Sequence, residues 1–79
     1  DDYCSSVAKE AAWYAVQRDA GVSRVDLKAQ VGFNLGPLYP LREIRAMHKV
    51  IDWVYDGYTS VVVETGCVAQ RTDGTWFDV

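Results

Sequence analysis

The sequence lacks most of the patterns that identify a catalytic or nucleotide-binding protein. It has one His, one Met and two Pro among 79 residues. It contains no Gly-x-Ser-x-Gly motif, no glycine-rich phosphate loop followed by Lys, and no Asn-x-Ser/Thr glycosylation site. No apolar run approaches the length of a transmembrane helix. These absences predict a protein that is not an enzyme, has no cofactor and does not span a membrane.

Positive charge is also scarce. The chain carries 8 Lys and Arg against 11 Asp and Glu, for a formal net charge of −3. No segment forms the basic stripe that would neutralise phosphates. We therefore expect no nucleic-acid partner and no attraction to an anionic membrane surface.

What the chain does have is the composition of a small globular protein. It is 49% hydrophobic and 24% charged, with three Trp, five Tyr and two Phe residues. A disordered chain would have fewer aromatic residues and more charge. We expect one domain over residues 1–79, near the lower size limit for a single hydrophobic core.

The two cysteines, Cys4 and Cys67, lie near opposite ends of the chain. In a small domain with a modest core this favours a disulfide, which could stabilise the fold by roughly 4 kcal/mol by closing a loop of about 64 residues. The alternative is two buried free thiols in a cytosolic protein. A zinc site would need two further ligands, so no metal is expected. The sequence begins with Asp1 instead of an initiator Met, so we expect a processed or trimmed chain. We expect a periplasmic or secreted protein.

The segment 41–58 is predicted to be the central helix. Its charged residues follow a helical period on one narrow face, and most of the remaining circumference is apolar. Such a helix must be covered on several sides. The apolar residues that recur at steps of three and four are Ile44, Met47, Ile51, Val54 and Tyr58.

Two further helices are predicted before it. Residues 3–20 form a helix that ends at Gly21, with a face of small residues suited to close packing against the central helix. Residues 22–32 begin with Ser23 and Asp26 in the manner of a capping box, although the apolar residues of this segment also alternate as they would in a strand. The small residues of the first helix are Cys4, Ala8, Ala11 and Ala15.

The remaining segments are less regular. Residues 33–40 contain two prolines and are predicted to form a loop whose apolar side chains fold over the core as a lid. Residues 60–79 fit either a fourth helix capped by Thr59 or Ser60, or strands with a turn at Asp73-Gly74. The fold class is therefore mainly α: a disulfide-linked bundle of three to four helices around residues 41–58. The alternative is α+β with a C-terminal hairpin.

Two groups of residues are candidates for a site. His48, Asp52 and Asp56 follow each other at steps of four along the central helix, and a His–carboxylate pair could perform acid–base chemistry. A structural salt bridge is the more common role of such a row. The second group is Trp13, Trp53 and Trp76, because aromatic residues beside charges are typical anchors of protein contacts. The competing interpretation places these tryptophans in the core.

Three features of the sequence resemble those of a known class of proteins: the segment AGVSxxDL, the helix with Trp53-Val54-Tyr55, and the late Cys67. Over residues 4–68 the chain resembles a class of short exported bacterial proteins that are mostly helical. The resemblance implies a periplasmic helical domain with one disulfide and implies no catalytic residue.

Three functional hypotheses follow. The first is a non-catalytic protein-binding module, such as an inhibitor or immunity-type protein, with a protein partner in the cell envelope or outside the cell. The second is a carrier or sensor of a small apolar ligand held beneath residues 33–39. The third is an enzyme that uses His48 with Asp52.

Overall fold

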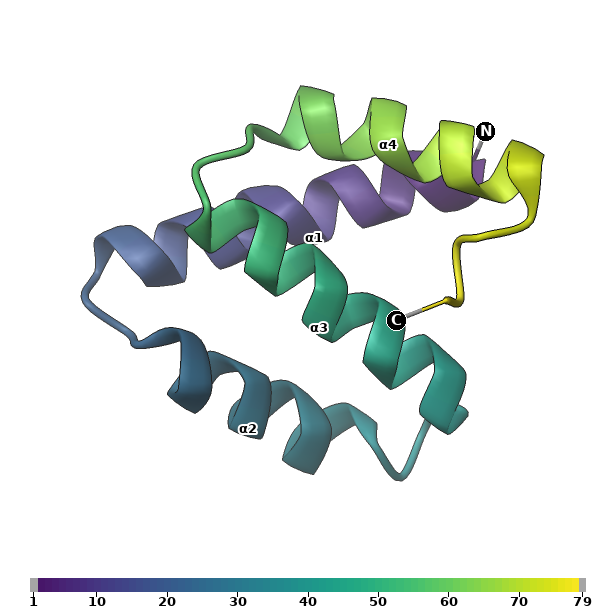
Figure 1. Ribbon diagram of the computed structural model, residues 1–79. Helices are drawn as coiled ribbons and strands as arrows, with labels where there is room; N and C mark the ends of the chain where they lie inside the picture. Colours follow the sequence, from purple (N-terminus) through teal and green to yellow (C-terminus); the bar gives the residue numbers. More distant parts are fainter. Residues whose placement is uncertain (1, 79) are drawn as a thin grey trace.

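The computed structural model describes residues 2–78 and consists of four α-helices (Figure 1). They are α1 (Asp2–Asp19), α2 (Arg24–Leu35), α3 (Leu41–Tyr55) and α4 (Ser60–Asp73). No strand occurs within residues 2–78, so the mainly α prediction is confirmed and the α+β alternative is wrong. Among these residues no helix is long and apolar enough to cross a membrane.

Helix α3 is the centre of the domain, as its apolar circumference predicts. It lies between α2 on one side and α4 on the other, and it also packs on α1 (Figure 1). The helix is shorter than the predicted range 41–58, because Asp56 caps it and Gly57 takes a positive φ of 103° that a continuing helix cannot adopt. Its buried residues are Ile44, Ala46, Met47, Val50, Ile51 and Val54.

Helix α1 ends as predicted, with Gly21 at a φ of 93°. We expected its small-residue face to pack on the central helix. Helix α1 does pack on α3, but it packs most extensively against α4, to which the Cys4–Cys67 disulfide joins it. The disulfide prediction is confirmed, and both cysteines are completely buried.

Helix α2 begins with the predicted cap, in which the Ser23 side chain accepts a hydrogen bond from the Asp26 backbone nitrogen at 3.1 Å. It continues to Leu35, beyond the predicted end at residue 32. The predicted lid over residues 33–40 is wrong, because Phe33 is 85% exposed and Leu38 is 73% exposed. Only Leu35 of this segment packs against the core, since it lies on the inner face of the last turn of α2.

Helix α4 begins at the cap formed by Thr59, whose side chain accepts a hydrogen bond from the Val62 backbone nitrogen. Gly66 lies in its middle, at a cost in helix propensity of about 1 kcal/mol relative to Ala. A Cβ at this position would lie 3.4 Å from the Trp53 ring, which is an ordinary van der Waals contact, so Gly66 marks where α4 packs beside Trp53.

After α4 the chain folds back against the core. Gly74 has a φ of 82° and ends the helix, and Trp76 is then only 3% exposed. Lys49 holds this tail by donating a hydrogen bond to the Trp76 backbone carbonyl, and it donates another to Gln70 Oε1 of α4 at 2.7 Å. Its ammonium group also lies 4.6 Å from the centre of the Trp76 ring.

Candidate functional site

The structure separates the three tryptophans that the sequence groups together. Trp13 is 49% exposed, on the polar side of α1 where its helical position places it. Trp53 is partly buried and packs against the core. Trp76 is part of the core, so its assignment as a partner-binding residue is wrong: it belongs to the folded-back tail, which places its indole against the core. Trp13 is therefore the tryptophan most available to a partner.

Helix α2 forms a hydrogen bond and ion pairs with the row of His48, Asp52 and Asp56. His48 Nε2 lies 3.0 Å from the Lys28 carbonyl oxygen, to which it donates a hydrogen bond. Asp52 is paired with Lys28 at 2.8 Å and with Arg24 at 3.2 Å, and Asp56 is paired with Arg24 at 2.8 Å. No described contact joins His48 to Asp52. The arrangement is that of a helix–helix contact between α2 and α3.

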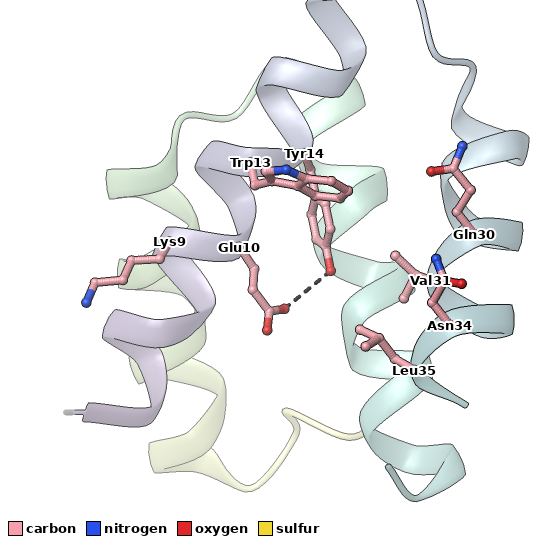
Figure 2. A pocket seen from close by; sticks show the side chains of 8 residues that line it. All are labelled: Lys9, Glu10, Trp13, Tyr14, Gln30, Val31, Asn34 and Leu35. Atoms are coloured by element: carbon pink, nitrogen blue, oxygen red, sulfur yellow. Dashed lines mark hydrogen bonds between the residues drawn. The ribbon is translucent and has the colours of Figure 1, made fainter. Parts of the chain in front are cut away.

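The site that the structure favours is a groove between α1 and α2, with a volume of about 360 Å³ (Figure 2). Tyr14 is buried at its base, and Val31 and Leu35 of α2 provide an apolar wall. Gln30 and Asn34 add neutral polar groups from the same helix. The groove thus combines an apolar interior with a few hydrogen-bonding groups, which is the usual composition of a binding site.

Trp13 lies at the edge of this groove. Its ring meets that of Tyr14 edge to face, with ring centres 5.9 Å apart and an interplanar angle of 66°. Figure 2 shows the indole extending over the groove, while the Lys9 side chain points away from it. The indole therefore contributes a large apolar surface that is about half exposed to solvent and packs on one side against the Tyr14 ring.

Glu10 is the charged group inside the groove. Its carboxylate accepts a hydrogen bond from Tyr14 Oη at 3.3 Å (Figure 2). Burial raises the pKa of Glu10 above its usual range; the Tyr14 hydrogen bond lowers that pKa in part, and the negative charge of Glu43 raises it. Burial, followed by the charge of Glu10, also raises the pKa of Tyr14, so its phenol remains a hydrogen-bond donor. The groove is therefore apolar with one acidic group.

Sequence reasoning found Trp13 but missed its partners in the groove. Trp13, Glu10 and Tyr14 are neighbours on α1, at spacings of three and four residues, and helical periodicity could have grouped them. That Val31 and Leu35 face the same space depends on how α1 and α2 cross. No sequence pattern encodes that crossing directly.

Among residues 2–78, no group of three or more His, Cys, Asp or Glu side chains is arranged to hold a metal ion. The fold and the groove together define a small, disulfide-linked four-helix domain with an open aromatic groove. Comparison with protein-family models, curated proteins and solved structures finds no match to this chain.

Proposed function

We propose that this domain is a non-catalytic protein-binding module, of the inhibitor or immunity type, and that the α1–α2 groove is its binding site. The observation that carries this proposal is the half-exposed Trp13 at the edge of a groove of about 360 Å³. Tryptophan is enriched among the residues that contribute most to protein–protein binding, particularly where it borders a pocket. The groove can receive one large apolar side chain of a partner.

The chemistry of the groove also describes that partner. The chain has a net charge of −3, and of the two charged residues that line the groove Glu10 faces its interior while the Lys9 side chain points away from it (Figure 2). Val16, one turn after Trp13 on α1, is exposed and extends the apolar surface. A complementary partner would present an apolar side chain flanked by Lys or Arg, since opposite charges guide association and fix register.

Export from a bacterial cell belongs to the same proposal. The disulfide between Cys4 and Cys67 supports it, because disulfides persist in oxidising compartments such as the periplasm or the extracellular space. The pairing of Asp52 and Asp56 with basic residues of α2 supports a non-catalytic role, because it leaves these carboxylates engaged in structure.

The volume of the groove favours a second candidate, a carrier of a small apolar ligand. About 360 Å³ lies at the lower end of the range for small-molecule sites. The ligand would lie in the α1–α2 groove, since residues 33–39 form no lid over the core. A rise in melting temperature across a library of hydrophobic compounds, with no protein partner captured, would favour the carrier.

The test is affinity capture from cell-envelope extract with the oxidised protein as bait and mass spectrometry as the readout. We expect one stoichiometric protein that Trp13→Ala fails to retain. Phe33→Ala is the matched control, because Phe33 is also an exposed aromatic residue but lies outside the groove lining. Equal capture by the wild type and Trp13→Ala, both shown to be folded by circular dichroism, would contradict the proposal.

A further inference from the structure

A second, smaller cavity adjoins the groove on the other side of Glu10. It lies between α1 and the first half of α3 and has a volume of about 180 Å³. This is several times the volume that one water molecule occupies in the liquid, roughly 30 Å³, so the cavity can hold a small organic group. The residues that matter for its chemistry are Glu10, Glu43, Tyr3, Tyr39, Met47 and Trp76.

The two carboxylates of this cavity are held by neutral donors. Tyr3 Oη donates a hydrogen bond to Glu43 at 2.8 Å, and Tyr14 Oη donates to Glu10 at 3.3 Å. Within residues 2–78, neither Glu10 nor Glu43 forms an ion pair with a Lys, Arg or His side chain. The negative charge of Glu43 is close enough to affect Glu10. The cavity therefore has two carboxylates that form no ion pair with a cation of the described part of the chain.

Aromatic rings complete the site. Arg71 already lies over the Tyr3 ring at 4.2 Å and Lys49 over the Trp76 ring at 4.6 Å. The third aromatic ring of this cavity, that of Tyr39, has no cation over it among residues 2–78 and is about half exposed. The electron-rich face of an aromatic ring attracts ammonium groups, and together with carboxylates such rings form the usual recognition site for alkylated ammonium.

We propose that the cavity between Glu10 and Glu43 binds an alkylammonium cation. The ammonium group would lie between the two carboxylates, and its methyl or methylene groups would contact Tyr39 and Met47. Free amines and the side chain of a Lys residue share this chemistry. A free amine would bind without any protein partner, so the site is independent of the partner proposed for the α1–α2 groove.

The experiment is a titration of the oxidised, 15N-labelled full chain at low ionic strength, followed by NMR chemical shifts and tryptophan fluorescence. The probes are choline and n-butylammonium, each paired with a neutral analogue of the same shape, 3,3-dimethyl-1-butanol and 1-butanol. We expect saturable shifts near Glu10, Glu43 and Tyr39 with the cations and none with the neutral analogues. Equal binding of a cation and its neutral analogue would overturn the proposal.

Three variants assign the site. Glu10→Gln and Glu43→Gln keep the shape and one acceptor oxygen of each side chain, and each should weaken binding by roughly tenfold by removing a charged contact. Glu64→Gln on α4 is the matched control and should bind as the wild type does, because Glu64 lines neither this cavity nor the groove. Unchanged affinity in both Glu10→Gln and Glu43→Gln, each verified as folded, would overturn the proposal. So would displacement of the probe by Ca²⁺ at equal concentration, because that result would indicate a metal site.

A final comparison distinguishes the sources of the cation. Nα-acetyl-lysine methylamide reproduces a Lys side chain in a protein, and its Nε-acetylated form removes the charge. Tighter binding of the lysine analogue than of choline would indicate a protein side chain, and the reverse would indicate a free amine. Either result supports an alkylammonium site, whereas equal binding of the acetylated form would contradict it. This outcome is separate from the capture experiment, which depends on Trp13.

Discussion

Two pairs of acidic residues differ in their partners: one pair forms ion pairs and the other accepts hydrogen bonds from neutral groups, although α3 contributes to both. Asp52 and Asp56, both on α3, contact Arg24 and Lys28 of α2 at 2.8 to 3.2 Å. Glu43 on α3 and Glu10 on α1 accept hydrogen bonds from tyrosines and have no ion pair among residues 2–78. The first pair joins two helices. The second leaves negative charge facing a cavity, where a ligand could neutralise it.

The difference follows from which residues the neighbouring helices present. Near Asp52 and Asp56, α2 presents its first turns, with Arg24 and Lys28 four residues apart on one face. Toward Glu10, α2 presents its later turns with the neutral residues Gln30 and Asn34. The charge distribution along α2 therefore gives Asp52 and Asp56 basic partners and gives Glu10 none.

The largest effect we expect comes from removing the disulfide, which fixes α1, and therefore Glu10, against α4. The double variant Cys4→Ala/Cys67→Ala should lose about 2–5 kcal/mol of unfolding free energy, which is typical of a native disulfide in a small domain. Urea denaturation followed by circular dichroism measures this loss. Reduction of the wild type should have a similar effect, and resistance of the fold to both would show that packing alone holds α1 in place.

Trp76→Ala should have an effect of similar size, about 3–5 kcal/mol, because the indole is buried in the core. Trp76 Nε1 also donates a hydrogen bond at 2.9 Å to Tyr3 Oη, which in turn donates to Glu43. Trp76→Phe keeps most of the apolar volume and removes this donor, so it separates packing from the hydrogen-bond chain. Urea denaturation of both variants provides the measurement. A loss below 1 kcal/mol in Trp76→Ala would contradict the burial of this residue.

Arg24→Gln tests Asp52 and Asp56, the acidic pair that forms ion pairs with α2. It removes the contacts to Asp52 and Asp56, and we expect the melting temperature to fall by a few degrees at low salt because these ion pairs are partly exposed. The difference from the wild type should shrink in 1 M NaCl, where charges are screened over about 3 Å. Thermal melts at the two salt concentrations provide the measurement. A difference that does not depend on salt would mean that Arg24 acts through packing on Tyr55, over whose ring it lies.

Local signals allowed much of the fold to be predicted. Ser23 and Gly21 are confirmed as predicted helix boundaries, and Thr59 is one of the two caps predicted for a fourth helix, because capping depends on neighbouring residues alone. The disulfide followed from cysteine number and spacing in a small chain. The lid over residues 33–40 was wrong because apolar composition does not say whether a loop reaches the core.

The site was less predictable than the fold. Helical periodicity placed Trp13 on the polar side of α1, where the structure has it. The burial of Trp76 depends on a tail that reverses after Gly74 and is held by Lys49. Both cavities next to Glu10 form where separate helices cross. Crossing geometry arises from the packing of the whole core, so a sequence pattern confined to one helix does not contain it.

The smallest effect on stability is expected from Glu10→Gln. It should have the opposite sign to the others, because this substitution should stabilise the protein at neutral pH. The pKa of Glu10 in the folded protein lies above its ordinary value, so between the two values the folded state holds more protons than the unfolded chain. Stability therefore falls as the pH rises through this window, and the Glu10 carboxylate destabilises the fold above it. Gln keeps an acceptor for Tyr14 and avoids the cost of a buried charge.

The melting temperature of Glu10→Gln should exceed that of the wild type by roughly 1–3 °C at pH 7, since 1 kcal/mol moves the melting temperature of a domain this size by about 4–8 °C. The difference should disappear near pH 3, where Glu10 is protonated in both states. The ionisable groups around Glu10 are Lys9, Tyr14, Glu43, Tyr3 and Tyr39, and Glu43 is the other carboxyl group among them. Glu43→Gln should therefore reduce the gain, while Glu64→Gln should leave it unchanged. A Glu10→Gln protein that is less stable at pH 7 would show that an unrecognised cation already neutralises Glu10, and the contrast between the two acidic pairs would be lost.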